Sequence, residues 1–85
     1  MENIFKLNIY TPDKIVMEGR AVSVVVPGAA GYLGVLAHHA PLVCATVPGK
    51  INVRDHAGKS LVIDSKGKGF LEVLNNNVTL LLESV

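Results

Sequence analysis

The 85-residue chain contains a single cysteine, Cys44, no tryptophan and only 5% aromatic residues. One cysteine excludes an intramolecular disulfide and favours a reducing compartment. Eight Lys and Arg residues against seven Asp and Glu residues leave a net charge of +1, which argues against nucleic acid or an anionic membrane surface as a partner. The chain also lacks a signal peptide and any apolar run of the about 20 residues that span a bilayer. These absences favour a soluble intracellular protein.

Hydrophobic residues make up 49% of the chain, and Val, Leu and Ile carry most of that share. β-Branched side chains on short segments favour strands, because their stiff rotamers suit a pleated surface. Residues 5–10 alternate between apolar and mostly polar side chains, the period of a half-buried strand. Eight or so such segments, with turn residues about every 8–12 positions, predict one all-β domain over residues 1–85. Its expected fold is an antiparallel sandwich or barrel.

Two features of the first half of the chain bear on its local structure. Residues 14–18 are predicted to form a short strand that ends at Gly19, and residues 20–26 a second strand with Val22, Val24 and Val26 inward. The glycine-rich stretch 27–34 then predicts an ordered, tightly turned loop, since glycine tolerates a positive φ.

This loop, together with the histidines that follow it, is longer than a strand reversal requires. It is either a crossover between the layers of a sandwich or a rigid projection that meets a partner.

No motif for nucleotide binding is complete. Gly58-Lys59-Ser60 resembles the end of a phosphate-binding loop. The pattern also requires a glycine where this chain has Val53, and a helix where strand residues follow. The glycines of stretch 27–34 have the wrong spacing for a dinucleotide fingerprint.

A metal or nucleophile site has weak support. Adjacent histidines on extended chain, here His38 and His39, point to opposite sides. Cys44 has apolar neighbours, which is typical of a small buried thiol. A small-ligand or metal-binding β domain that uses His38, His39 and Cys44 remains the alternative hypothesis. The sequence predicts no catalytic residues and no cofactor, hence a chain that is not an enzyme.

A set of collinear motifs resembles the epsilon subunit of rotary (F-type) ATP synthases. The resemblance spans residues 5 to 82 and is specific as a set, although each motif alone is common. The matching pieces are Thr11-Pro12-Asp13, Val22 to Pro27, Gly31-Tyr32-Leu33-Gly34-Val35-Leu36, His39-Ala40-Pro41-Leu42, Pro48-Gly49, Gly69-Phe70-Leu71-Glu72-Val73 and Asn77-Val78-Thr79-Leu80-Leu81.

The resemblance implies a flattened β-sandwich of about ten short strands that belongs to the rotor. It implies a non-catalytic central-stalk subunit that docks onto gamma and the c-ring and couples ion flow to ATP synthesis. Such a subunit is peripheral to the cytoplasmic face of the inner (plasma) membrane and does not insert into it. On the ring side we expect Gly31, Tyr32, Leu33, Gly34, His38 and His39, and on the gamma side Tyr10, Pro41, Leu42, Phe70 and Glu72.

Three departures from the family pattern affect these expectations. Tyr32 stands where the family usually has Glu, so a charge contact with the ring is replaced by a large apolar ring with one hydroxyl. Ala37 and His38 replace a usual Pro-Gly. The family usually continues as two C-terminal helices that carry the nucleotide site, and this chain stops at Val85. We therefore expect no helical hairpin and no bound nucleotide in the chain as given.

Overall fold

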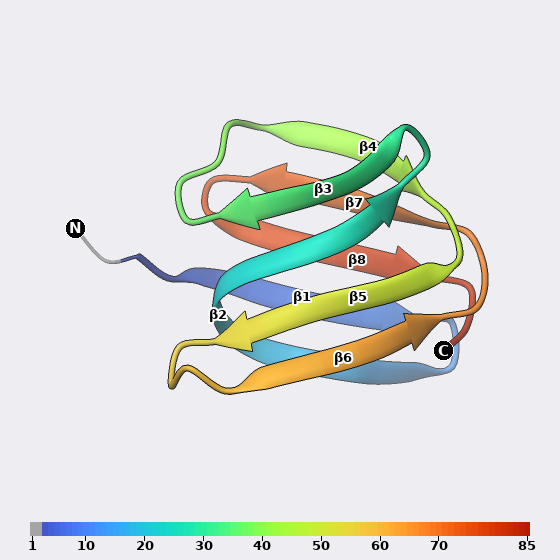
Figure 1. Cartoon of the computed structure of the whole chain (residues 1–85), viewed down its shortest axis with the longest axis horizontal. Coiled ribbons are helices and arrows are strands. Elements are labelled where there is room, and N and C mark those ends of the chain that lie inside the picture. Colours follow the sequence, from blue (N-terminus) through green and yellow to red (C-terminus); the bar gives the residue numbers. More distant parts are fainter. Residues whose placement is uncertain (1–2) are drawn as a thin grey trace.

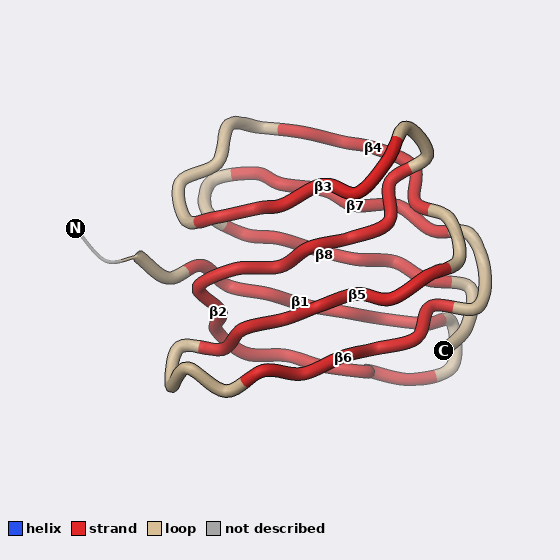
Figure 2. Tube along the Cα trace, in the orientation of Figure 1, coloured by secondary structure: helices blue, strands red, loops and turns tan. Residues whose placement is uncertain are grey.

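The alternating segments form the strands of a computed structural model that describes residues 3–85. Strands, loops and turns account for all of this range, and no helix occurs within it (Figure 2). Eight strands are present among these residues, where the family resemblance implied about ten, and two of the strands predicted from the sequence are merged in one of them. The strands are β1 (Phe5–Thr11), β2 (Lys14–Gly28), β3 (Gly31–Leu36), β4 (Leu42–Thr46), β5 (Gly49–Asp55), β6 (Ser60–Ser65), β7 (Gly69–Leu74) and β8 (Asn77–Leu82).

The strands lie in two layers joined through β2 (Figure 1). Strands β3, β5, β6 and the second half of β2 make the nearer layer, and β1, β4, β7, β8 and the first half of β2 the farther one. The expected antiparallel arrangement is confirmed for every pairing of the described strands but one. Strands β1 and β8 run parallel, with Leu7 beside Val78 and Ile9 beside Leu80, because the N-terminal strand docks on the last strand across the whole chain. The other pairings are antiparallel.

Strand β2 is continuous over 15 residues, so the predicted break at Gly19 is wrong. Gly19 pairs with Leu7 of β1, and the hydrogen bonds of the β1–β2 ladder hold this part of the chain in the strand. The corner between the layers comes at Ala21–Ser23, where the register against β5 shifts by a bulge. The bulge buries Ala21 and leaves Val22 only half-buried, so the expected inward position of Val22 is also corrected.

The predicted glycine loop is mostly strand. Only Ala29 and Ala30 form the turn, and β3 begins at Gly31, which has a φ of 126°. A side chain on Gly28 would lie 2.8 Å from the carbonyl oxygen of Gly31, so glycine is needed for this close approach. Gly34 pairs with Val25 as an ordinary strand residue. The glycines therefore serve a tight hairpin rather than a long loop.

The core lies between the two layers and is aliphatic apart from Phe5. The side chains at alternate positions of β1, β7 and β8 fill it from one layer, and those of β2, β3, β5 and β6 from the other, as the period-two pattern predicts. The buried apolar residues are Phe5, Leu7, Ile9, Ala21, Val24, Val26, Val35, Ile51, Val53, Ile63, Leu71, Val73, Val78, Leu80 and Leu82.

Candidate protein-docking site

One outer face of the domain carries a row of exposed apolar side chains. It crosses β2, β1, β8, β7 and β4 in neighbouring register positions. Ile15, Leu81 and Phe70 expose 61%, 52% and 59% of their surface. An apolar row of this length on a small domain is typical of a protein-docking surface. We call it the apolar row; its members are Ile15, Tyr10, Leu81, Phe70 and Ala45.

The residues predicted for the gamma side fall into three groups. Tyr10 and Phe70 belong to the apolar row, and Glu72 is exposed on the same face, two positions along β7 from Phe70. Pro41 is exposed just before β4, at the margin of this face. Leu42 pairs with Val73 and packs, half-buried, against the core. Leu42 therefore contributes more to the stability of the fold than to the surface predicted to contact gamma.

Tyr10 is held in the apolar row by a hydrogen bond. Its hydroxyl donates to Oε2 of Glu18 at 2.8 Å. This bond raises the pKa of Tyr10 above its ordinary value, with burial and the negative charge of Glu18 adding in the same direction. The hydrogen bond thus satisfies the polar end of the ring.

The β2–β3 turn forms a second apolar feature at one end of the domain. Tyr32 is 64% exposed and borders a shallow hollow lined by residues 28–31, Leu33, Cys44 and Ala45. Cys44 is half-buried there, so the prediction of a buried thiol holds only in part. Because Ala45 belongs to both features, this hollow adjoins the apolar row.

The predicted ring-side residues lie at both ends of β3. Gly31 and Tyr32 begin this strand, whereas His38 and His39 follow its last residue at the opposite end of the domain. From Gly31 to Leu36 the strand takes five residue steps, which at about 3.3 Å per residue span about 17 Å between the two groups. A single contact at one end of the sandwich cannot include both.

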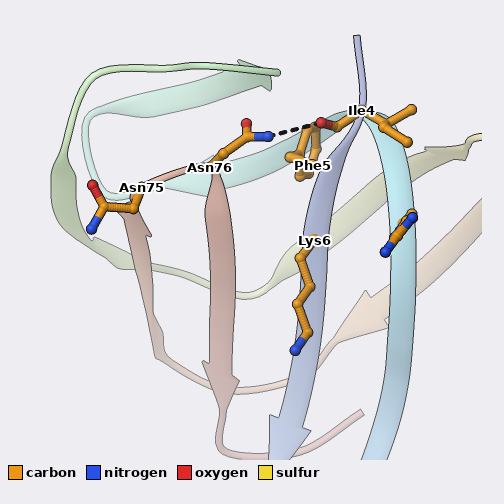
Figure 3. Close-up of a pocket in the computed structure, with 6 residues that line it drawn as sticks. Ile4, Phe5, Lys6, Asn75 and Asn76 are labelled. Carbon is orange, nitrogen blue, oxygen red and sulfur yellow. Dashed lines mark hydrogen bonds between the residues drawn. The ribbon is translucent and has the colours of Figure 1, made fainter. Parts of the chain in front are cut away.

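The histidine end is organised by Asn76, a residue that the sequence analysis did not single out. Its Oδ1 accepts a hydrogen bond from the backbone N–H of His38 at 2.8 Å. Its Nδ2 donates to the carbonyl oxygen of Ile4 at 2.9 Å, the dashed line in Figure 3. Asn75 and Asn76 have φ values of 50° and 61°, which asparagine tolerates. Asn76 therefore joins the β7–β8 turn to the chain start and to the β3–β4 loop.

The residues of the alternative hypothesis do not assemble into a metal site. Within residues 3–85, no three His, Cys, Asp or Glu side chains gather closely enough to hold a metal ion. His39 instead places Nδ1 2.7 Å from the carbonyl oxygen of Ala40. Over the same range, no helix is long and apolar enough to cross a membrane.

Comparison with known proteins identifies the family. Residues 4–85 match the model of the "ATP synthase, Delta/Epsilon chain, beta-sandwich domain". The chain belongs to the ATP synthase delta/epsilon family. This membership confirms the prediction made from the collinear motifs.

Two relatives of this delta/epsilon chain show how far the similarity extends. The ATP synthase epsilon chain of Wolbachia pipientis wMel is 39% identical over 85 residues, which cover 98% of this chain and 72% of the relative. That of Leptospira interrogans is 35% identical over 81 residues, which cover 95% of this chain but 62% of the relative. The chain thus spans about three fifths of the length of the Leptospira relative and about seven tenths of that of the Wolbachia relative.

Solved structures agree on the fold. A chain of the Euglena gracilis mitochondrial ATP synthase, solved as an OSCP/F1/c-ring assembly, superposes with a TM-score of 0.85. The match covers 92% of this chain and 49% of that one at 22% sequence identity. A chain from the Tetrahymena thermophila central stalk and ring gives a TM-score of 0.75 at 14% identity. The β-sandwich is therefore kept while the sequence changes almost completely.

Proposed function

We propose that this chain is a non-catalytic rotor subunit in the central stalk of a proton-translocating ATP synthase, where it docks onto gamma and the c-ring. Its docking would couple ion flow to ATP synthesis. Membership of the delta/epsilon family is the observation that carries this proposal. The solved relatives come from assemblies described as F1/c-ring and central stalk/c-ring. In this role the chain lies on the cytoplasmic face of the plasma membrane, outside the bilayer.

We assign the gamma contact to the face that carries the apolar row. Exposed apolar side chains at the centre of a face supply most of the binding energy when a partner covers them. Phe70 and Leu81 are neighbours on β7 and β8 near the middle of this row. Of the residues expected from the resemblance, Tyr10, Phe70 and Glu72 support this contact and Pro41 borders it.

We assign the ring contact to the β2–β3 turn, with Gly31, Tyr32, Leu33 and Gly34. Tyr32 offers an exposed ring beside an apolar hollow, which suits packing against a loop rather than a charge pair. His38 and His39 belong to the other end of β3. They can serve only a separate contact, on the side away from the ring.

The gamma assignment is tested by measuring affinity calorimetrically with purified gamma. Replacing Phe70 by Asp should weaken binding about tenfold or more, since it removes a central aromatic contact. Val62→Asp is the matched control, because Val62 is 53% exposed and lies on β6, in the other layer. Equal affinity of the two variants would contradict the assignment.

The ring assignment is tested by reconstitution with isolated c-rings. Tyr32→Asp should weaken association with the ring and leave the thermal unfolding midpoint unchanged, since Tyr32 is exposed. Leu36→Asp, at the far end of the same strand and also 64% exposed, is the control. Loss of ring association in the Leu36 variant alone would place the contact at the histidine end.

A further inference from the structure

Strand β3 is an edge strand, and no described strand covers its second side. It pairs only with β2, in a register that is regular from Gly31 to Leu36. In Figure 1 it lies at the margin of the nearer layer. The open side of an edge strand presents a row of unpaired backbone N–H and C=O groups, which another chain can pair with.

The hydrogen bonds of β2 show which backbone groups of β3 point outward. The carbonyl oxygen of Pro27 accepts from the N–H of Val47, which follows β4 on the side of β2 opposite β3. Tyr32 is the partner of Pro27 in the β2–β3 ladder, so its own N–H and C=O point away from β2. Because this pattern alternates, those of Gly34 and Leu36 also point outward. In the described part of the chain, no backbone hydrogen bond from a loop or turn reaches these three residues.

The three residues can be reached from outside. Tyr32 and Leu36 are each 64% exposed, and Gly34 is exposed as well. The hydroxyl of Tyr32 lies 3.3 Å from the place that a Cβ on Gly49 of β5 would take, so its side chain leans across β2 and leaves the edge uncovered. A Cβ on Gly34 would have only Cγ2 of Val25 beside it, at 4.0 Å. Both the edge of β3 and the surface over Gly34 are therefore open.

The other edges of the sandwich carry charges, and β3 does not. Strand β6 pairs only with β5 and contains Asp64, which forms an ion pair with Lys50. The part of β2 that pairs only with β1 contains Lys14, Glu18 and Arg20. Charged side chains on an edge discourage strand addition. Strand β3 contains neither a charged residue nor a proline, so it is the edge to which another chain adds most readily.

The ligand that fits this edge is an extended polypeptide backbone. Only an extended chain repeats its N–H and C=O groups in step with those of Tyr32, Gly34 and Leu36, about every 6.6 Å along the strand. The position opposite Gly34 suits a large apolar or aromatic side chain, because such a residue covers the surface that an edge glycine leaves open.

The surroundings of β3 select gamma among the proposed partners. A partner that meets only the β2–β3 turn, as assigned to the c-ring, touches one end of β3 and cannot lie along it. A second copy would have to bring a whole sandwich to this edge, where β4 of the farther layer reaches beyond β3 (Figure 1). The face assigned to gamma ends at Ala45, which lines the same hollow as Tyr32. A segment of gamma can therefore leave the apolar row and continue along β3.

We propose that an extended segment of gamma adds as a strand to the open edge of β3, with its backbone bonded to Tyr32, Gly34 and Leu36 and a large apolar side chain over Gly34. The inference rests on the proposed function, because it takes gamma as the partner. It adds the mode of binding: this part of the contact is made by backbone groups and needs no charge pair. The side chain of Tyr32 projects from the face of the sheet and stays available to the c-ring.

Amide hydrogen exchange tests the pairing directly, followed residue by residue by mass spectrometry in the free chain and in its complex with purified gamma. The amides of Tyr32, Gly34 and Leu36 should exchange at least about tenfold more slowly in the complex, because each then donates to gamma. Leu33 and Val35 lie between them and already face β2 in the ladder. Their exchange should change less, which gives an alternating pattern that simple coverage of the surface does not produce.

The open edge of β6 is the matched control. The N–H of Asp55 donates to the carbonyl oxygen of Lys59. By alternation along the β5–β6 ladder, the amides of Ser60, Val62 and Asp64 point outward. Their exchange should be the same in the free chain and in the complex.

Two variants of Gly34 test the central hydrogen bond. Gly34→Pro removes the outward N–H without removing a bond within the domain, and proline is tolerated on edge strands. It should weaken binding to gamma about tenfold or more, since one donor is lost and the proline ring obstructs the incoming strand. Gly34→Ala keeps the N–H and has room for its methyl group, so it should bind nearly as well as the wild type. Thermal unfolding of both variants checks that the fold is kept.

The outcomes separate this inference from the proposed function. Gamma binding with unchanged exchange at Tyr32, Gly34 and Leu36 would overturn the inference while the proposed function stands. Slowed exchange that appears in the chain alone as its concentration rises would identify a second copy as the occupant, and slowed exchange with isolated c-rings alone would identify the ring; either result would overturn the assignment to gamma. Failure of the wild-type chain to bind gamma at all would overturn both.

Discussion

Gly69, the first residue of β7, has no room for a side chain. A Cβ at this position would overlap the carbonyl oxygen of Leu81 on the neighbouring strand. It would also come within 2.9 Å of Cδ2 of Leu82 and of Oγ1 of Thr46. The backbone carbonyl cannot rotate away without breaking the β7–β8 ladder. We therefore expect Gly69→Ala to push these two strands apart.

Two opposing effects determine how far Gly69→Ala lowers the free energy of unfolding. Overpacking a filled site destabilises by about 1–3 kcal/mol, and replacing Gly by Ala regains about 0.4–1 kcal/mol from the unfolded chain. The net loss is about 1–2 kcal/mol, equivalent to a fall of about 5–15 °C in the unfolding midpoint of a domain this small. Far-UV circular dichroism on heating measures it directly, and urea titration checks the free energy.

Gly19→Ala is the control for this substitution. Gly19 is also a strand glycine, but the nearest atom to its added Cβ is Cε of Met17 at 4.0 Å. Its midpoint should stay the same or rise slightly. A Gly69→Ala midpoint no lower than that of Gly19→Ala would refute the reasoning, because it would mean that β7 and β8 separate at no cost.

Two further predictions concern side-chain hydrogen bonds. Asn76→Ala should destabilise the domain by about 2 kcal/mol, since each of its two bonds, to His38 and Ile4, is worth about 1 kcal/mol. Asn75→Ala, measured by the same urea titration, shares the left-handed backbone without such bonds and should cost less. The hydroxyl of Thr11, 2.7 Å from Oδ1 of Asp13, lowers the pKa of that carboxyl. The stabilising effect of this hydrogen bond should be present near neutral pH and fade as pH falls through the lowered pKa of Asp13. Thr11→Val should reduce this difference in stability between the two pH ranges. It should also move the Asp13 pKa, followed by NMR, toward its ordinary value of about 3.9, while the backbone hydrogen bond of Asp13 still lowers it in part.

Local alternation was sufficient to predict most strands. Residues 5–10 became β1 because one face of the segment is apolar and the other mostly polar, and a period of two allows no other element. The same reasoning failed where pairing outweighs local preference. Gly19 lies inside a ladder with Leu7, and the glycine-rich stretch 31–36 is held as a strand by β2.

The docking face could be predicted only in part. Phe70 and Tyr10 followed from the family resemblance, but Leu81 and Ile15 did not, because local alternation leaves open which strands become neighbours. The parallel pairing of β1 with β8 sets Tyr10 beside Leu81 and Asn8 beside Thr79. The apolar row depends on this contact between the first and the last strand.

Strand β2 has a mechanical consequence. It pairs with β1 in one layer and with β3 and β5 in the other, and Gly28 bridges to Thr46 on β4. A sideways load on the β2–β3 turn is therefore shared among ladders in both layers, whose hydrogen bonds resist it together. The layers cannot slide past each other unless these bonds break at the same time. Under the proposed function, a load received at Tyr32 would pass through β2 into the strands of both layers.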